Sequence, residues 1–375
     1  MKSIIYIITQ LANAGPTRVL YDIIKHLDCT RYNPIVYKLT KDIPSRDITP
    51  KFIELKAEVR EFNFSYWKME LQTKKCAAEV REALKQYEAP ILHVHGYHPV
   101  LISSFLEEYP SIVTLHNISA EDYLLTFGFF QGKYMQWRYM RALKKISMYV
   151  AISDSVKKAY RGILDEVKLT RIYNGSSINW NEKYSKRELR MRLGLPIDKR
   201  IFVTVGALSK RKDPMTIIRA FQHLTLKEKV NNYLLLFIGV GDKEQVCRDL
   251  IGDNENIQLL GYKFNVEDYF HAADYSICAS HSEGFGLNFV ESLMCGTLVI
   301  GSVIPPFLEF MNIAPELKEY SFTPGNEMEL VSVIRKKMEL SSINTEQIAW
   351  LFQDEFSATS MSSNYMSLYQ EIHCE

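Results

Sequence analysis

Short apolar runs alternate with amphipathic stretches along most of the 375-residue chain. In the first half, runs rich in Val, Ile and Tyr occupy residues 4–9, 34–39, 91–96, 112–117 and 148–153. In the second half, similar runs occupy residues 201–208, 233–241, 257–262, 275–280 and 298–302. Helical patterns lie between them, such as Pro16–Leu27 and Pro214–Leu224, each opened by a proline suited to a first turn. Because strand–helix–strand repetition produces parallel sheets covered on both faces, the chain is predicted to be α/β with two doubly wound domains.

The two sets of runs also predict where the domains divide. A chain of this length suits two domains, and the polar stretch Ser176–Leu189 is the predicted linker. We expect domains at residues 1–178 and 179–357. The end of the chain, FSATSMSSNYMSLYQEIHCE, is expected to form a serine-rich cap region followed by an amphipathic helix.

The composition limits the kinds of partner. Lys and Arg number 45 against 44 for Asp and Glu, so no net charge attracts nucleic acid and any anion site has to be built locally. The six cysteines contain no C-x-x-C pair, which is typical of reduced thiols in a cytosolic protein. The N-terminal stretch MKSIIYIITQLANAGP lacks the apolar length of a signal peptide or a spanning helix. We therefore expect a cytoplasmic protein that binds no nucleic acid.

Residues just after the strands are the first candidates for a site, because ligands of doubly wound sheets bind beyond the carboxyl ends of the strands. After the first strand, Gly15 opens a helix whose exposed amides can bind an anion, with an ordinary turn as an equal alternative. The basic triplet Lys210–Lys212 follows the first strand of the second half and precedes a helix that starts with proline. A helix N-terminus already favours negative charge, so the triplet predicts a phosphate site.

Three histidines lie on or after strands of the first half. His93 and His95 alternate along one strand and so share a face, and His116 follows the next strand. No further ligand stands at metal-binding spacing, so no metal site is predicted. Histidines within strands are most often hydrogen-bonded core or rim residues, and His116 alone is expected to be functional.

The stretch HSEGFGLNFVESLMCG, residues 281–296, follows the strand predicted at 275–280. Its glycines let the backbone approach a ligand closely, and amides at the start of the following helix can bind phosphate. Glu283 before the turn and Glu291 within the helix can each accept hydrogen bonds from sugar hydroxyls. Carboxylates on both sides of a phosphate cradle predict a nucleotide sugar, with ribose at one glutamate and hexose at the other.

The run EGFGLNFVESLMCG resembles the E-x7-E signature of the retaining GT-B glycosyltransferases of family 4, the glycosyl transferases group 1. Weaker motifs agree in order along essentially the whole chain, among them NAGPTRVL, HVHG, VTLHN, AISDS, YNGSSI, VGALSKRKD and IGVGD. The resemblance implies two Rossmann-like parallel-sheet domains that face a central cleft. It also implies an acceptor-side domain at 1–178, a nucleotide-sugar-binding domain at 179–357, and a C-terminal helix, 358–375, that crosses back to the first domain.

The resemblance assigns roles to individual residues. Glu291 matches the glutamate that binds ribose, Glu283 the glutamate that contacts the transferred sugar, and Lys212 the lysine that binds diphosphate. The family often has G-R-L where this chain has Gly206–Ala207–Leu208, so the usual arginine is missing and Arg211 is the candidate substitute.

Further positions match by their place in the motifs. His116 matches the histidine at the floor of the cleft and is the catalytic candidate of the first domain, beside Glu283, Lys212 and Arg211 of the second. The remaining donor-side or loop matches are Gly15, Gly206, Phe264, Gly284, Phe285, Gly286 and Leu287.

The implied activity is transfer, with retention of configuration, of a sugar from a nucleotide diphosphate sugar, expected to be a UDP-sugar. The expected acceptor is a glycan or lipid-linked glycan, as in bacterial surface polysaccharide synthesis. No cofactor and no metal are expected, since no two aspartates stand two positions apart in the D-x-D motif that holds a metal in GT-A enzymes.

Other functions stay open. The missing arginine at Ala207 is compatible with a non-catalytic nucleotide-sugar-binding protein on the same scaffold, and a nucleotide-sugar epimerase shares the fold but needs no acceptor. An NAD-dependent oxidoreductase is disfavoured, because Glu244 stands where GVGDKE would need the third glycine of the dinucleotide fingerprint.

A contact with a membrane is also an open alternative. Residues 133–145 mix Tyr134, Trp137 and Tyr139 with five cations, a composition that suits the inner face of the plasma membrane. An ordinary helix with a solvated basic face explains the segment equally well.

Overall fold

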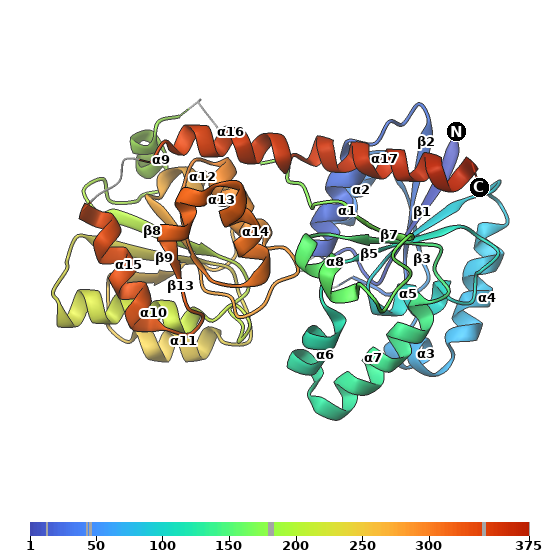
Figure 1. The fold of residues 1–375 in the computed structure, drawn as a ribbon, viewed down its shortest axis with the longest axis horizontal. Coiled ribbons are helices and arrows are strands. Elements are labelled where there is room, and N and C mark those ends of the chain that lie inside the picture. The colour runs from blue at the N-terminus through green and yellow to red at the C-terminus, as the bar shows by residue number, and fades with distance from the viewer. Residues whose placement is uncertain (13, 43, 45–46, 179–183, 340–342, 375) are drawn as a thin grey trace. The chain divides into compact units, whose positions relative to one another are not determined.

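Figure 1 shows the computed structural model of the chain, which describes residues 1–12, 14–42, 44, 47–178, 184–339 and 343–374. The chain forms two compact units. Unit 1 contains Met1–Ser177 and Ser357–Glu375, and unit 2 contains Ile178–Phe356. The last segment of the chain therefore belongs to the same unit as the first.

Unit 1 is built on a seven-stranded sheet in the order β3-β2-β1-β4-β5-β6-β7. Every neighbouring pair is parallel, and the central strands β4 and β5 are buried along their whole length, as strands covered on both faces must be. The strands are β1 (Lys2–Ile8), β2 (Tyr32–Lys38), β3 (Glu58–Glu61), β4 (Ile91–His95), β5 (Ser111–Leu115), β6 (Met148–Ala151) and β7 (Leu169–Arg171). The helices are α1 (Gly15–Lys25), α2 (Thr49–Glu54), α3 (Tyr66–Leu71), α4 (Thr73–Leu84), α5 (Tyr97–Ser103), α6 (Ser119–Phe127), α7 (Phe129–Leu143), α8 (Asp154–Tyr160) and α17 (Ala358–Cys374).

Unit 2 repeats this plan with six parallel strands in the order β10-β9-β8-β11-β12-β13. The strands are β8 (Arg200–Val205), β9 (Tyr233–Ile238), β10 (Ile257–Leu259), β11 (Tyr275–Cys278), β12 (Leu298–Ser302) and β13 (Ser321–Phe322). The helical elements are α9 (Lys186–Arg192), α10 (Pro214–Gln222), the π-helical turn η1 (His223–Lys227), α11 (Glu244–Ile251), α12 (Val266–Ala272), α13 (Leu287–Met294), α14 (Pro305–Ile313), the 3₁₀ turn η2 (Pro315–Tyr320), α15 (Glu327–Glu339) and α16 (Thr345–Glu355). Part of its core is a cluster of strand and helix side chains around Ile201, Leu236 and Phe270.

Both sheets share one topological feature. In each of them the first strand lies inside the sheet, and the chain fills one side of the sheet before it crosses to the other. The order therefore reverses between β1 and β4 in unit 1 and between β8 and β11 in unit 2. Loops that follow two such strands diverge and leave space for a ligand. The predicted class, two doubly wound parallel-sheet domains, is confirmed.

Two segments differ from the sequence prediction. Of the linker predicted at Ser176–Leu189, residues 179–183 lie outside the described residues, and the end of the stretch is helical because Ser185 caps α9 in a capping box. The serine-rich region expected to precede the last helix lies mostly inside it, since α17 begins at Ala358. Serines can stay in a helix when their hydroxyls find acceptors, as the buried Ser362 does on the carbonyl of Ile23 at 2.9 Å.

Helix α17 is attached to the sheet of unit 1 through buried tyrosines. The Tyr369 hydroxyl lies 2.7 Å from Nδ1 of His93, and Nε2 of the same ring lies 2.8 Å from the Thr114 hydroxyl. The Tyr365 hydroxyl reaches Thr114 as well, at 2.9 Å. His93 is thus a hydrogen-bonded core residue, as expected, and it joins the middle of the sheet to the end of the chain.

Deletion of one hydroxyl tests how strongly α17 is attached. Tyr369→Phe leaves the buried Nδ1 of His93 without this partner, and an unsatisfied buried polar group costs ~1–3 kcal/mol. We expect the free energy of unfolding in urea to fall by about that amount. Tyr134→Phe, at a half-exposed ring on α7, is the matched control and should change little. Equal losses in both variants would contradict the role given to Tyr369.

Candidate functional site

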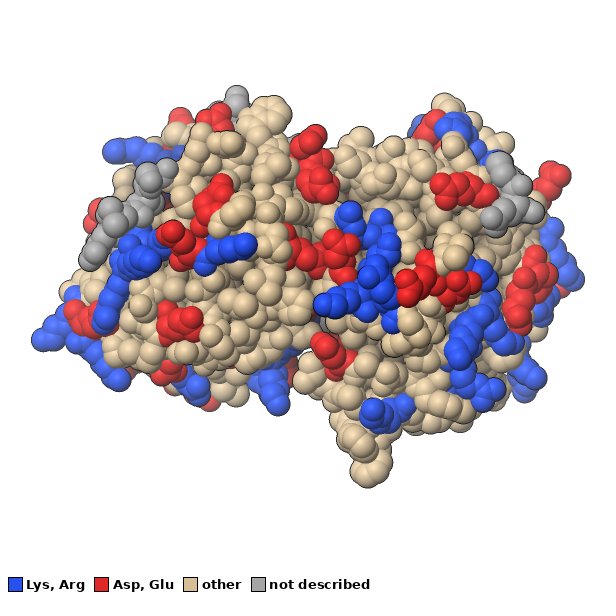
Figure 2. Space-filling view, in the orientation of Figure 1, with Lys and Arg blue, Asp and Glu red and all other residues tan. Residues whose placement is uncertain are grey.

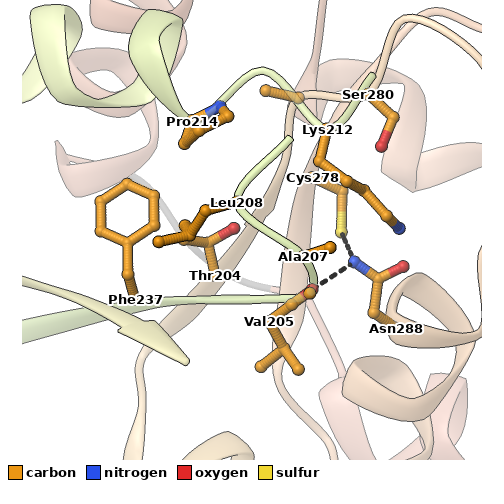
Figure 3. A pocket seen from close by; sticks show the side chains of 12 residues that line it. Thr204, Val205, Ala207, Leu208, Lys212, Pro214, Phe237, Cys278, Ser280 and Asn288 are labelled. Atoms are coloured by element: carbon orange, nitrogen blue, oxygen red, sulfur yellow. Dashed lines mark hydrogen bonds between the residues drawn. The ribbon is translucent and has the colours of Figure 1, made fainter. Parts of the chain in front are cut away.

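The loops that follow β8 and β11 meet at the point where the strand order of unit 2 reverses. The first loop leads into α10 and the second into α13. Their backbones are joined where the amide of His281 donates to the carbonyl of Arg211 at 2.9 Å. The side-chain amide of Asn288, in the first turn of α13, donates to the carbonyl of Val205 at 2.9 Å and contacts the Cys278 sulfur at 3.4 Å (Figure 3). The two strand ends are therefore tied together beneath the loops.

A shared carboxylate lies between the two loops. Arg211 Nη1 is 2.5 Å from Glu283 Oε2, and Lys212 Nζ is 2.5 Å from Glu283 Oε1. The Ser280 hydroxyl donates to the same Oε1 at 2.7 Å. These four residues are the Glu283 cluster, and its carboxylate side chain is only 7% exposed.

The ionisation of the cluster follows from these contacts. Burial by itself raises the pKa of Glu283, but Lys212 and Arg211, with hydrogen bonds from Lys212 and Ser280, lower it from 4.5 to about 2. The carboxylate is therefore charged at neutral pH. Two cations surround one anion, so the Glu283 cluster carries an excess of positive charge. A ligand anion can bind there without any change of protonation.

Glycines let segments of the backbone pack closely in this region. Gly206 has φ +145°, and a Cβ built on it would lie 3.5 Å from Cε of Lys212. A Cβ on Gly239 would overlap the carbonyl oxygen of Gly206, so the loop after β9 packs backbone to backbone against the loop after β8. Gly286 caps α13 with φ +100°, which L side chains rarely adopt. The loop segment 239–241 thus supports the loop that carries Lys212.

A small cavity of about 20 Å³ lies beneath the loop after β8. Its walls are Thr204, Val205, Gly206, Ala207, Leu208, Lys212, Pro214, Phe237, Cys278, Ala279, Ser280 and Asn288 (Figure 3). This volume suits about one water molecule and is far below the ~300–1,000 Å³ of a typical small-molecule site. A nucleotide that binds in unit 2 therefore has to lie over these loops rather than inside this cavity.

Other predicted donor residues occupy different surroundings. Glu291 is 1% exposed within α13. The Phe285 ring is buried against Phe310 and Phe356, so only its backbone can serve a ligand. Phe264, in the loop after β10, is 79% exposed and packs edge-on against Tyr262 at 5.0 Å.

The two candidates of the first half lie in unit 1. Gly15 begins α1, with nothing within 4 Å of a Cβ built on it. His116 follows β5 and is partly exposed, and its Nε2 lies 2.9 Å from Nδ1 of His95. Burial lowers the pKa of His116 to about 4, so the ring is neutral at pH 7. The structure therefore brings Gly206, Arg211, Lys212 and Glu283 together in unit 2 and places Gly15 and His116 in the other unit.

Sequence reasoning missed three polar residues of this site. Ser280 donates to Glu283, and Asn288 holds the strand ends together. Asp213 caps α10 through the amide and hydroxyl of Thr216 and pairs with His281 at 3.0 Å. An aspartate before a helix-starting proline is a readable cap signal, but nothing in the sequence showed that Asp213 would meet a loop of β11.

The described part of the chain offers no metal centre. No group of three or more His, Cys, Asp or Glu residues there has the geometry to hold a metal ion. The five cysteines whose side chains are described are free thiols.

Family models divide the chain in the same way as the fold. The model of the glycosyl transferases group 1 matches residues 185–349, and that of Glycosyltransferase Family 4 matches residues 14–179. The chain belongs to the GT4-type glycosyltransferases.

Similar proteins include polysaccharide enzymes of bacteria. The chain is 23% identical over 380 aligned positions to the O-antigen biosynthesis glycosyltransferase WclY of Escherichia coli, with 99% of each chain covered. It is 25% identical over 283 positions to the putative teichuronic acid biosynthesis glycosyltransferase TuaC of Bacillus subtilis. That alignment covers 71% of this chain and 68% of TuaC.

Solved structures share the fold of this glycosyltransferase. HepE of Anabaena, solved with UDP and glucose, superposes with a TM-score of 0.79 at 17% identity and covers 99% of this chain and 100% of its own. Sucrose-phosphate synthase of Thermosynechococcus elongatus superposes with a TM-score of 0.82 at 15% identity and covers 100% of each chain. These likenesses confirm the predicted GT-B fold.

The pH dependence of stability tests the Glu283 cluster. The pKa of Glu283 in the folded chain, about 2, lies below the ordinary 4.5, so its ionised form stabilises the fold above pH 4.5 and this contribution is lost as the pH falls from 4.5 towards 2. Urea unfolding of Glu283→Gln should therefore depend less on pH in that window than the wild type does. Glu255→Gln, at an exposed carboxylate of the same unit, should follow the wild type. A Glu283→Gln curve parallel to the wild type would show that the carboxylate is not held by its two cations.

Proposed function

We propose that this glycosyltransferase moves a sugar from a nucleotide diphosphate sugar, with UDP as the nucleotide, to a glycan or lipid-linked glycan, with retention of configuration and without a metal. The observation that carries the proposal is the Glu283 cluster at the reversal of strand order in unit 2. It holds two cations, each 2.5 Å from an oxygen of one charged carboxylate, directly before the helix that starts at Leu287. Cations suit the diphosphate, and the carboxylate suits sugar hydroxyls.

The names of similar proteins support the substrate class. The relative from Escherichia coli is named for O-antigen biosynthesis, and that from Bacillus subtilis for teichuronic acid biosynthesis. HepE was solved with UDP, with UDP-glucose, and with UDP and glucose. A UDP-sugar donor and a polysaccharide acceptor are therefore the proposal for this chain too.

The leaving group needs positive charge. When the bond from the sugar to the diphosphate breaks, negative charge develops on the phosphate oxygens, and fixed cations and amides stabilise it. In the proposal, Lys212 and Arg211 supply the cations, and the amides of Gly284, Phe285, Gly286 and Leu287 supply donors at the start of α13. Arg211 takes the place of the arginine absent at Ala207, because it shares the carboxylate of Glu283 with Lys212.

Groups other than the two cations are proposed to bind the transferred sugar, the ribose and the base of the donor. Glu283 is ionised and accepts from hydroxyls of the transferred sugar, while the Phe264 backbone, beyond β10, contacts the base. Glu291 is proposed to bind the ribose, and since it is 1% exposed, this contact requires the segment before α13 to shift when the donor binds. When the donor binds, Lys212 and Arg211 would contact the diphosphate as well as Glu283, and this exchange of partners is compatible with such a shift.

The transfer step is proposed to proceed on one face of the sugar. The bond between the anomeric carbon and the phosphate oxygen breaks, and the acceptor oxygen bonds to the same carbon from the same side. The acceptor proton passes to the leaving phosphate. Neutral His116 is proposed to hold the acceptor hydroxyl on the side of unit 1, where Gly15 marks the flexible loop.

A lipid-linked acceptor places the enzyme at the inner face of the plasma membrane in this proposal. Within the described residues, no helix combines the length and the apolar character needed to cross a bilayer. Contact with the membrane surface is proposed to involve residues 133–145 on and after α7.

Donor turnover tests the proposed function. After removal of metals by chelating chromatography, and with EDTA present, the chain should still release UDP from a UDP-sugar, found among nucleotide sugars by thermal shift. Lys212→Ala should lower the rate ~10²-fold or more through lost stabilisation of the leaving group. Lys210→Ala, at the exposed lysine two positions earlier, is the matched control.

Three results would contradict the proposal. Activity that vanishes with EDTA and returns with Mg²⁺ or Mn²⁺ would refute the metal-independent site. Binding without nucleotide release would favour a non-catalytic protein, and an isomerised nucleotide sugar without acceptor would favour an epimerase.

A further inference from the structure

The hairpin of α6 and α7 exposes an unusual set of apolar side chains. Phe130 is 88% exposed and Phe129 67%, directly after the turn at Gly128. The apolar tip of this hairpin consists of Leu125, Phe127, Phe129 and Phe130, all of them exposed. Figure 2 shows the end of the hairpin, which projects from the body of unit 1, as a surface without charged residues. Large apolar side chains gathered in this way usually mark a surface for a partner.

The hairpin is held by contacts between α6 and α7 and by contacts with the rest of unit 1. The exposure of the apolar tip therefore does not result from a loosely packed segment. A Cβ on Gly132 would lie 2.6 Å from the carbonyl oxygen of Tyr123, which shows that α6 and α7 are in backbone contact. The buried Tyr139 ring packs 5.7 Å from that of Tyr123. Arg138 pairs with the buried Glu70 at 2.5 Å and donates to its carbonyl at 3.0 Å, which joins α7 to α3.

One face of α7 continues the tip towards the base of the hairpin. Its residues recur at the spacing of a single helical face and are all exposed: Phe130, Tyr134, Trp137, Arg141 and Lys144, the last just after the helix. We call them the α7 stripe. Its outer half is aromatic and its inner half is cationic, and the Arg141 guanidinium lies 5.1 Å from the centre of the Trp137 ring.

The charges from the end of α6 to the end of β6 have one sign. Residues 123–153 contain no Asp or Glu but five Lys or Arg. Arg138 and Lys145 are paired, with Glu70 and Glu107. No carboxylate of the described chain is paired with Lys133, Arg141 or Lys144. The surface therefore combines exposed aromatic rings with cations that can meet an anionic partner.

We propose that the apolar tip and the α7 stripe bind an anionic lipid surface. Phe129, Phe130, Tyr134 and Trp137 would enter the interfacial layer, where aromatic rings are favoured, and the cations would contact headgroups. The α7 stripe itself contains no acidic residue, which argues against a second copy of this chain as occupant, because two such stripes would bring like charges together. This inference rests on the membrane contact of the proposed function and extends its segment, 133–145, towards the apolar tip. Within that segment Tyr139 is buried and Arg138 is paired with Glu70, whereas the most exposed rings lie before residue 133.

Vesicle co-sedimentation of the full chain tests this surface. We expect binding to vesicles of phosphatidylglycerol and phosphatidylcholine, and much less to phosphatidylcholine alone. The double variant Phe129→Ser/Phe130→Ser should partition at least about tenfold more weakly, because it removes apolar area that would leave water. Trp350→Ser/Leu351→Ser, at an adjacent exposed pair on α16, is the matched control and should bind as the wild type does. Lys133→Gln/Arg141→Gln/Lys144→Gln should lose the preference for anionic vesicles.

A second readout does not depend on the folding of any variant. Vesicles should slow amide hydrogen exchange of the wild-type chain around residues 125–137, and UDP release by the tip variant in solution should stay at the wild-type rate. The rate of UDP release shows whether the proposed transfer activity fails, independently of whether the surface binds vesicles. The proposal would be overturned if the wild-type chain did not bind anionic vesicles, or if the tip variant bound them as well as the control does. A dimer of the wild type in solution that the tip variant abolishes would also overturn it.

Discussion

Each half of the chain is organised by a parallel sheet whose first strand lies inside the sheet and not at its edge. Because the chain fills one side of the sheet and then the other, the loops after the two central strands part from each other, and a ligand can approach the ends of both. In unit 2 this point lies after β8 and β11, where Asn288 joins the strand ends and the Glu283 cluster lies above them. The position of the candidate site therefore follows from the order of the strands.

The Glu283 cluster also explains how an anion site can exist in a chain without net charge. Two cations pack against one partly enclosed carboxylate, whose pKa they hold at about 2, so the carboxylate keeps them in place across the neutral range. A buried pair of opposite charges contributes little net stability to the fold, since the cost of desolvation offsets most of the attraction. We interpret the arrangement as preorganisation: Glu283 holds Arg211 and Lys212 where the proposed diphosphate would need them. Glycine suits position 206 in this loop because its φ of +145° is one that L side chains rarely adopt.

The sequence predicted the fold better than the details of the site. Buried strands produce apolar runs, so the central strands were found, whereas the short edge strands β3, β7 and β13 have no such run and were missed. The signature glutamates were visible from their spacing. The pairing of Arg211 with Glu283 was not, because it joins residues 72 positions apart through loops that only the folded sheet brings together. The exposure of the Phe129 and Phe130 rings was equally hidden, since periodicity alone does not show which side of a helix stays uncovered.

Calorimetric binding of UDP and of uridine tests the central claim most directly, because the two ligands differ only in the diphosphate. If Arg211 and Lys212 bind that group, the wild type should prefer UDP strongly, since each charged hydrogen bond contributes ~1.5–3 kcal/mol. The variant Arg211→Gln/Lys212→Gln should bind uridine as the wild type does and lose most of the preference for UDP. Comparison of two ligands within one variant removes effects of altered stability. A variant that still prefers UDP as strongly as the wild type would contradict the claim that the cations of the Glu283 cluster bind the donor.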